Sequence, residues 1–378
     1  MVGPFSIDTY LPAFPSIEVD LGVSRALLSQ TLAIYLASFA LMTLVWGPVS
    51  DRFGRKPVLY LSTALYLLSS LACALAEDFE SLMLFRALQG ISASGGYVAG
   101  RAMIRDAFNQ TEARQVMSQV MMLFALGPAI APLVGSALHD IFGWRSIFYF
   151  LAFYGAVALL MVVMRLAESL KPEDQQSIHP QQVAKTYYRE VTHLRFVLLV
   201  FIVTICFAGL FIYIAGAPTI IFDFMGWQTT DFVWLFIPVT IGIMLGAASA
   251  AKLAHLWSAE KIINNAFIIL MIASVFNLVL IYMHYYSPML IIGSIAVYSF
   301  ALAWLMPNIS ILALDCFPKN RGSAAAVQGS IQMTSNALIA AIVAPMLAAS
   351  FLHFATAQFV FVILALVLWY LLPSSTLN

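Results

Sequence analysis

Gly47-Pro48-Val49-Ser50-Asp51-Arg52-Phe53-Gly54-Arg55-Lys56-Pro57-Val58-Leu59 lies between two long apolar runs near the start of the chain. The stretch holds three cations, one carboxylate, two glycines and two prolines. Glycine allows a tight backbone turn, and proline disfavours continuation of a helix. We therefore predict a tight turn between two helices, with cations typical of the cytoplasmic end of a membrane span.

The composition excludes a water-surrounded globular protein. The chain is 62% apolar and 10% charged, with a mean hydropathy of +0.92, whereas soluble domains average about 25% charged residues. The formal net charge is zero, which gives no reason to expect a nucleic-acid partner. Cys73, Cys206 and Cys316 lie far apart and show neither metal-ligand spacing nor a disulfide framework, so we interpret them as packing residues.

Apolar runs of about 20 residues, enough to span a bilayer, recur along the whole chain. No cleavable signal peptide is visible, because no Lys or Arg precedes Arg25. We predict an all-α membrane protein with twelve spans: Met1–Ser16, Leu27–Val49, Val58–Ala76, Ser81–Met103, Gln115–Leu138, Trp144–Ala167, Phe196–Phe222, Phe232–Ala254, Ile262–His284, Met289–Leu314, Gly322–Leu347 and Phe351–Leu372.

The longest polar segment divides these spans into two groups of six. We predict an N-terminal six-helix bundle at 1–167, a central cytoplasmic loop at 168–195 and a C-terminal six-helix bundle at 196–378. The first span is short, and we expect either a native start upstream of Met1 or a truncated copy. Lys and Arg concentrate in the turns on the same side as Asp51–Pro57, so both termini are predicted to be cytoplasmic.

The opening stretch resembles the G-x-x-x-D-R-x-G-R-K/R motif that follows the second helix of major facilitator transporters. Its matching positions are Gly47, Asp51, Arg52, Gly54, Arg55 and Lys56. The resemblance implies the major facilitator fold, with two six-helix bundles around a midplane substrate site. It also implies a cytoplasmic gate of Asp51, Arg55 and Asp106, with Asp51 facing the start of the eleventh span. The alternative is a set of separate, solvated charges.

Asp8 places a carboxylate inside the first apolar span, within Ile7-Asp8-Thr9-Tyr10-Leu11-Pro12-Ala13-Phe14-Pro15. A charge at membrane depth costs about 2.5–3.5 kcal/mol on insertion scales, so Asp8 is expected to face a cavity, bind a proton or pair with a cation. The alternative is a solvated position near the interface. The segment resembles the opening of the Bcr/CflA subgroup of drug:proton antiporters, which implies that Asp8 is linked to proton binding.

Arg86 lies early in the fourth span, in Arg86-Ala87-Leu88-Gln89-Gly90, which resembles the facilitator R-x-x-Q-G motif. The resemblance implies a role in proton coupling, and we hypothesise that Arg86 lies near Asp8. The alternative is an arginine that extends to the outer surface.

The fifth span contains Gly127, Pro128, Pro132 and Gly135. These residues predict a kinked and closely packed helix, and they resemble the motif associated with exporters in this superfamily.

Polar, aromatic and methionine side chains inside the spans are candidates for a substrate cavity, because polar groups at membrane depth need polar neighbours or water. Gln328, Gln332 and Asn336 are spaced by four residues and share one helix face. Interhelical hydrogen bonding is the alternative explanation for them. The candidates are Tyr10, Gln89, Tyr97, Met121, Tyr213, Trp304, Asn308, Gln328, Gln332 and Asn336.

Enzyme and ATPase motifs are absent from the sequence, including G-x-x-x-x-G-K-[ST] and H-E-x-x-H. We therefore predict no enzymatic activity, no metal and no cofactor, with the proton gradient as the energy source. The resemblance implies a bacterial inner-membrane exporter of small lipophilic compounds that exchanges them for protons and works as a monomer. The alternatives are a dedicated exporter or symporter of one metabolite, and an inactive or sensor-like pseudo-transporter.

Overall fold

The computed structural model describes residues 2–108, 110–170, 180–254, 256–285, 287–318 and 320–372, and within these ranges all regular structure is helical. Nine helices in the described ranges are long and apolar enough to cross a membrane. They correspond to nine of the twelve predicted spans. These helices are Arg25–Phe53, Arg55–Ala74, Arg145–Arg165, Leu194–Ala215, Thr229–Leu253, Ala259–Tyr282, Pro288–Asp315, Arg321–Leu347 and Phe351–Leu371.

The remaining three predicted spans have a different form. The fourth and fifth are the helices α5 (Phe79–Ala107) and α6 (Gln110–Phe142), and within α6 the segment Leu126–Phe142 is apolar. The first is not one continuous helix. It is broken into α1 (Val2–Asp8), the short 3₁₀ helix η1 (Leu11–Ala13) and α2 (Phe14–Leu21).

Proline explains the break in the first span. Pro12 and Pro15 occupy the first turns of η1 and α2, where a missing N–H is tolerated, whereas inside one long helix each would remove a backbone hydrogen bond. The helical turn of α1 therefore ends at Asp8, and the Asp8 carboxyl group lies at a helix end rather than on a continuous helix face.

Backbone packing divides the chain into two compact units. Unit 1 comprises Met1–Tyr188 and Ala325–Ala337, and unit 2 comprises Arg189–Ala324 and Leu338–Asn378. The change from the first unit to the second falls inside α8 (Pro180–Thr192), the helix of the predicted central segment.

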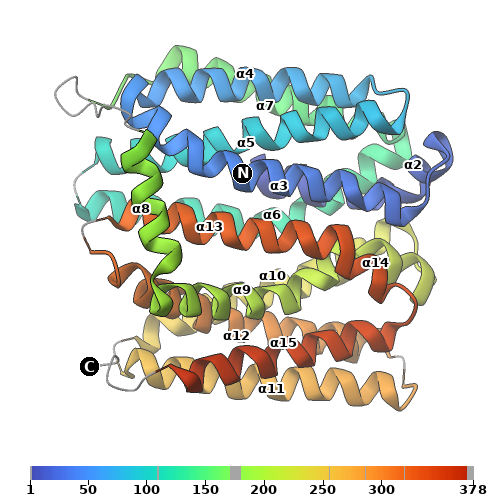
Figure 1. The fold of residues 1–378 in the computed structure, drawn as a ribbon. Coiled ribbons are helices and arrows are strands. Elements are labelled where there is room, and N and C mark those ends of the chain that lie inside the picture. The colour runs from blue at the N-terminus through green and yellow to red at the C-terminus, as the bar shows by residue number, and fades with distance from the viewer. Residues whose placement is uncertain are drawn as a thin grey trace. The chain divides into compact units, whose positions relative to one another are not determined.

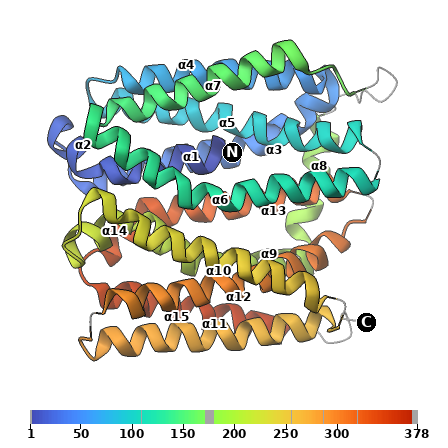
Figure 2. The same ribbon diagram turned by 180° about the vertical axis from the view of Figure 1, so that it is seen from behind.

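Unit 1 is built around α5. This helix packs between α3 (Arg25–Phe53) and α4 (Arg55–Ala74), and α4 also packs on α7 (Arg145–Arg165) (Figure 1). On the other side of the unit, α1 packs on α6 (Figure 2). Gly90 permits the contact between α5 and α3, because a Cβ atom at this position would overlap the Tyr35 carbonyl group.

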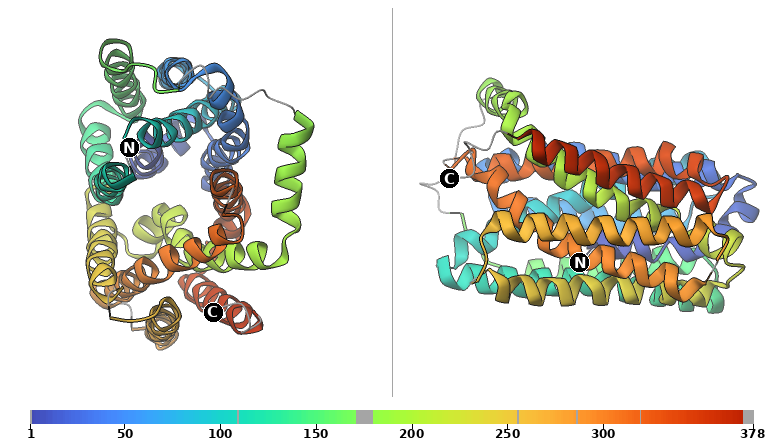
Figure 3. Two further views of the ribbon diagram at one scale, coloured as in Figure 1. Left: turned by 90° about the vertical axis from the view of Figure 1, so that its left-hand side faces the viewer. Right: turned by 90° about the horizontal axis from the view of Figure 1, so that it is seen from below.

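Unit 2 is built around α12 (Pro288–Asp315), which packs on α9 (Leu194–Ala215), α10 (Phe232–Leu253) and α11 (Ala259–Tyr282) (Figure 2). The last helix, α15 (Phe351–Leu371), packs on α9 and α11. Figure 3 shows these long helices end-on and from the side. Shorter or shared elements complete the described chain: η3 (Thr219–Phe224), η4 (Thr229–Asp231), α13 (Arg321–Leu338), η5 (Ile339–Val343) and α14 (Ala344–Leu347).

Candidate functional site

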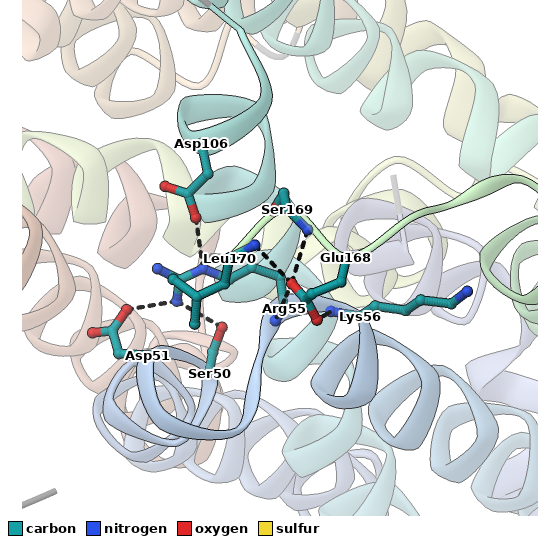
Figure 4. A network of polar contacts seen from close by, with 8 residues as sticks. All are labelled: Ser50, Asp51, Arg55, Lys56, Asp106, Glu168, Ser169 and Leu170. Carbon is teal, nitrogen blue, oxygen red and sulfur yellow. Dashed lines mark hydrogen bonds and ion pairs between the residues drawn. The ribbon is translucent and has the colours of Figure 1, made fainter. Parts of the chain in front are cut away.

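Arg55 is the centre of the turn between α3 and α4. Its buried guanidinium group donates hydrogen bonds to Asp51 Oδ1 at 2.5 Å, to Ser50 Oγ at 2.9 Å and to Asp106 Oδ2 at 2.8 Å. One cation thus joins the end of α3, the start of α4 and the end of α5 (Figure 4). The structure therefore brings together the three residues that the sequence predicted as a gate.

Gly54 makes this turn possible. Its φ angle is +102°, in a region of backbone conformation that residues other than glycine rarely adopt. Gly54 is both the C-cap of α3 and the N-cap of α4, so it is the single residue between the two helices. Gly54 N–H donates to the Ser50 carbonyl group at 3.2 Å, which closes the end of α3.

Glu168 is a fourth part of this site that the sequence prediction missed. Its carboxylate accepts hydrogen bonds from the backbone N–H groups of Arg55 and Lys56, each at 3.0 Å. The N–H groups of Ser169 and Leu170 also donate to it, each at 2.9 Å (Figure 4). A carboxylate at the first turn of a helix satisfies N–H groups without helical partners and complements the helix dipole.

The neighbouring cations do not join this cluster. Arg52 lies over the ring of Phe53, 5.4 Å from its centroid, and the Lys56 side chain extends away from the carboxylates (Figure 4). Gly47 lies inside α3, where a Cβ atom would meet open space. The geometric core of the motif is therefore Asp51, Gly54 and Arg55, completed by Asp106 and Glu168.

Arg86 occupies a second buried site, in the middle of unit 1. Its side chain is 0% exposed, so it does not extend to the membrane surface. Its Nη1 atom donates to Gln89 Oε1 at 2.5 Å and to the Ser6 carbonyl oxygen at 3.2 Å. The guanidinium lies 4.5 Å from the ring centroid of Tyr35 and 5.0 Å from that of Tyr10, close enough for cation–π attraction.

Hydrogen bonds and the cation–π contact with Tyr10 connect Arg86 to four helices of unit 1. Gln89 donates to Ser70 Oγ at 2.8 Å, the Ser6 and Tyr66 hydroxyl oxygens are 2.6 Å apart, and Tyr10 and Thr31 hydroxyl oxygens are 2.9 Å apart. The Nε and Nη2 atoms of Arg86 are buried without a hydrogen-bond partner among the described residues. The cation is therefore held by neutral groups and aromatic rings, with two donors left over.

Asp8 ends α1, two residues after Ser6, whose carbonyl group binds Arg86. Its side chain is 4% exposed, and none of the hydrogen bonds or ion pairs among the described side chains involves its carboxyl group. The structure places Arg86 against Ser6, Gln89 and two tyrosines, and not in an ion pair with Asp8. A buried carboxyl group without a partner cation is expected to bind a proton, because its charged form is poorly solvated.

Of the predicted cavity residues in unit 1, Tyr10 and Gln89 belong to the Arg86 site. Tyr97 is half-buried on α5, with the Arg101 guanidinium 4.2 Å from its ring centroid. Asn336 is buried, and its Oδ1 atom has no partner among the described residues. Gln328 and Gln332 are half-buried on the same helix, and the Met121 side chain falls outside the described residues.

The predicted cavity residues of unit 2 occupy two places. Trp304 donates to Ser249 Oγ at 2.8 Å and Asn308 donates to the Trp304 carbonyl oxygen at 2.7 Å. Tyr213 lies in the core of the unit, where its hydroxyl oxygen accepts a hydrogen bond from Asn277 at 2.7 Å. Tyr213 is therefore a core residue of unit 2 in this structure.

Asn277 and Gln358 were not among the predicted residues, yet they organise the core of unit 2. Asn277 Nδ2 also donates to Gln358 Oε1 at 3.0 Å, and Gln358 Nε2 donates to the Gly209 carbonyl oxygen at 3.2 Å. Both side chains are fully buried, and Asn277 Oδ1 has no partner among the described residues. The available signal in the sequence was an amide at membrane depth: Gln358 is the single amide of its span, and Asn277 lies among apolar residues.

The Gly127–Gly135 segment lies within α6, which continues through Pro128 and Pro132. A Cβ atom at Gly135 would overlap the Thr9 carbonyl group, so α6 contacts the backbone at Thr9, directly after the end of α1. The glycine therefore brings α6 next to the break in the first span.

The chain is similar to known membrane transporters. The model of the Major Facilitator Superfamily matches residues 1–339. "Uncharacterized MFS-type transporter YdgK" of Bacillus subtilis (strain 168) is 31% identical over 92% of this chain and 85% of its own length. "Bicyclomycin resistance protein homolog" of Haemophilus influenzae is 25% identical over 92% of this chain and 87% of its own length. "Multidrug resistance protein MdtL" of Escherichia coli is 28% identical over 66% of this chain and 63% of its own length.

The fold is also found among solved structures. The crystal structure of a D-xylose-proton symporter superposes with a TM-score of 0.76 and 16% sequence identity, and the match covers 99% of this chain and 96% of that one. This likeness concerns the fold alone. Together with the family match over 1–339 and the long apolar helices, it leads to one conclusion. This chain is a multi-pass membrane transporter that belongs to the Major Facilitator Superfamily.

Proposed function

We propose that this transporter exports small lipophilic compounds across the bacterial inner membrane in exchange for protons. The observation that carries the proposal is the Asp8 carboxyl group, which is buried in unit 1 without an ion pair among the described residues. Such a group is neutral in an apolar setting and becomes ionised when water or a cation reaches it. Asp8 is therefore suited to bind a proton on one side of the membrane and release it on the other.

Arg86 is proposed to assist this exchange. Its guanidinium is fixed by Gln89 and by the Ser6 carbonyl group of the same helix that carries Asp8. Two of its donors have no partner among the described residues, so a rearrangement of α1 can bring a carboxylate to them without breaking an existing ion pair. Contact with Arg86 would favour the ionised form of Asp8 and so release its proton.

The direction of transport rests on the relatives and on α6. Two of the three relatives carry names that refer to resistance to bicyclomycin or to several drugs, which supports export of such compounds and membership of the Bcr/CflA subgroup. The Gly127–Gly135 segment, with its resemblance to the exporter motif, supports the same direction. Orientation with both termini in the cytoplasm follows from the distribution of Lys and Arg.

Proton release from inverted membrane vesicles tests the proposal. Vesicles with an acidic lumen receive a panel of lipophilic cations and neutral antibiotics, and a pH-sensitive dye reports luminal protons. We expect at least one compound to discharge the gradient in vesicles with this chain, and no compound to do so in vesicles without it.

Asp8→Asn is expected to abolish this discharge, because an amide neither binds nor releases a proton. Asp223→Asn is the matched control, since Asp223 is exposed at the end of η3. Discharge by Asp8→Asn at the wild-type rate would contradict the assignment of Asp8. Compound-driven acidification of the lumen, with protons entering together with the compound, would indicate a symporter.

A further inference from the structure

Glu190 is a buried carboxyl group that the export mechanism above does not use. It lies in the last turn of α8 and is 0% exposed. Its Oε1 atom is 2.5 Å from Ser323 Oγ, in the first turn of α13. Its Oε2 atom is buried without a hydrogen-bond partner among the described residues. Both residues belong to unit 2.

Counting hydrogens indicates which form of Glu190 fits this site. Ser323 has a single hydroxyl hydrogen, and its Oγ atom also lies 3.0 Å from the Asn320 carbonyl oxygen, which can only accept. If the hydroxyl hydrogen goes to Asn320, the hydrogen between Ser323 and Glu190 must come from the carboxyl group. A protonated Glu190 therefore satisfies every close contact, whereas an ionised one leaves a charged oxygen buried without a donor.

An apolar contact lies beside this polar one. Phe317, between α12 and α13, meets the ring of His193 at 5.2 Å and that of Phe196 at 5.3 Å between centroids, and the Arg189 guanidinium lies 5.4 Å from its centroid. Phe317 thus holds the end of α8 and the start of α9 through contacts that involve no carboxyl group. Among these contacts, the bond between Glu190 and Ser323 is the one that involves a carboxyl group.

The charged groups around Glu190 set the direction of its response. Burial raises the pKa of Glu190, while its hydrogen bond with Ser323 and the charge of Arg189 lower it in part. On the adjoining elements, His193 and Arg195 lie at the start of α9, and Arg321 is paired with Asp315 between α13 and α12. No second carboxylate contacts Glu190 among the described residues, so burial is the cause of the raised pKa.

We propose that Glu190 binds a proton on the cytoplasmic side and, in its protonated form, fastens α8 to the first turn of α13. Ionisation of Glu190 releases this fastening, which we call the α8–α13 latch (Glu190 and Ser323). The proposal rests on the proposed proton exchange, because a carrier driven by protons moves them through its cytoplasmic end. Glu190 is a positioning residue here, since it acts on α13 and not on the transported compound.

The sign of the effect follows from the raised pKa. The latch is most stable below the ordinary pKa of glutamate, about 4.3, because both the closed and open forms are then protonated. Between that value and the raised pKa of the closed form, the open form loses its proton first, and the opening equilibrium increases up to about tenfold per pH unit. Above the raised pKa the equilibrium becomes constant again.

Hydrogen–deuterium exchange on the full chain in detergent micelles tests the latch. Exchange is measured from about pH 5 to about pH 9 and divided by the intrinsic rate at each pH, so that only opening remains. We expect the amides of 185–192 and 320–326 to open more as the pH increases. Glu190→Gln, which keeps a neutral hydrogen-bonding side chain, is expected to remain protected over the whole range.

Glu260→Gln is the matched control, because Glu260 is an exposed carboxylate in the first turn of α11. It should keep the wild-type profile. A flat profile in the wild-type protein, or a rise that persists in Glu190→Gln, would overturn the proposal. A flat wild-type profile overturns the proposal even if the variant does not fold.

The exchange measurement does not require transport. If the proton-release assay fails and the exchange profile increases with pH in the wild-type protein but not in Glu190→Gln, the export function is wrong and the latch stands. If proton release succeeds and the profile is flat, the latch alone is wrong.

Discussion

Three buried charged residues of unit 1 meet their surroundings in three different ways. Arg55 is bonded to two carboxylates, Arg86 is held by neutral oxygens and aromatic rings, and Asp8 has no ion pair among the described residues. Removing one partner of a buried pair leaves an uncompensated charge and is costly. The ion pairs of Arg55 are therefore costly to break, whereas Asp8 can gain or lose a proton without breaking an ion pair.

Asp20, in the last turn of α2, forms an exposed ion pair with Arg145. Its carboxylate accepts hydrogen bonds from Arg145 Nη1 at 2.6 Å and from Trp144 Nε1 at 2.9 Å. These bonds, led by that from Arg145, lower the pKa of Asp20. Asp20→Asn is expected to reduce the free energy of unfolding at neutral pH by less than about 1 kcal/mol, because the pair is exposed to solvent.

The pH dependence has a definite sign. A lowered native pKa stabilises the fold above the unfolded value of about 3.9, and this contribution disappears as the pH falls through the native value. Thermal unfolding in detergent should therefore show wild type and Asp20→Asn converging as the pH is taken to about 3. A difference that stays constant over this range would contradict the assignment.

The close packing of α5 against α3 depends on a glycine at one position of α5 and not at another. A Cβ atom at Gly90 would overlap the Tyr35 carbonyl group, whereas at Gly96, on the same helix, it would meet open space. Gly90→Ala is expected to cost about 1–3 kcal/mol through overpacking of α5 against α3. Gly96→Ala is expected to stabilise by about 0.5–1 kcal/mol, because alanine is the better helix residue.

Thermal unfolding of the two variants beside wild type measures this contrast. The substitutions are chemically identical and six residues apart, so a shared effect of detergent or expression cancels. Equal changes for both variants would show that α3 and α5 are not in contact at Gly90.

The first turn of α4 is capped by the Glu168 carboxylate. Glu168→Ala removes the acceptor of the Arg55 and Lys56 N–H groups, and loss of a helix cap costs about 1 kcal/mol. Amide exchange should increase in the first turn of α4. Glu77→Ala, an exposed glutamate just beyond the other end of α4, should leave both stability and exchange at wild-type values; an equal effect of the two substitutions would exclude capping.

The sequence predicted the parts of the structure that are local in the chain. Asp51 and Arg55 are four residues apart, and the apolar runs mark nine spans with small errors at their ends. Glu168 was missed because its partners are backbone N–H groups far away in the sequence. Any carboxylate can accept hydrogen bonds from such groups, so no sequence pattern marks this one. Asn277 and Gln358 were missed because 81 residues separate them and neither belongs to a periodic pattern. The break in the first span was missed, although Pro12 and Pro15, which explain it, are present in the sequence.

At the scale of the whole molecule, the topology is the feature that most constrains the mechanism. If the turn at Gly54 faces the cytoplasm, an even number of spans places the C-terminus there as well, as the distribution of Lys and Arg predicts. A C-terminal green fluorescent protein should fluoresce, and a C-terminal alkaline phosphatase should be inactive. The reverse result would place the latch and the Arg55 cluster on the outer side and would invert the proposed route of the proton.

The contact between Glu168 and the start of α4 also has a consequence for biosynthesis. The carboxylate lies 113 residues after the Arg55 N–H group that it binds, and a ribosome adds about 5–20 residues per second, so α4 leaves the ribosome about 6–23 s before its cap. During this interval the first turn of α4 has only water or lipid headgroups for its N–H groups. The nascent chain thus completes the α3–α4 turn only when the sixth span has emerged, and a ribosome stalled before residue 168 would hold an N-terminal bundle in which this turn is unfinished.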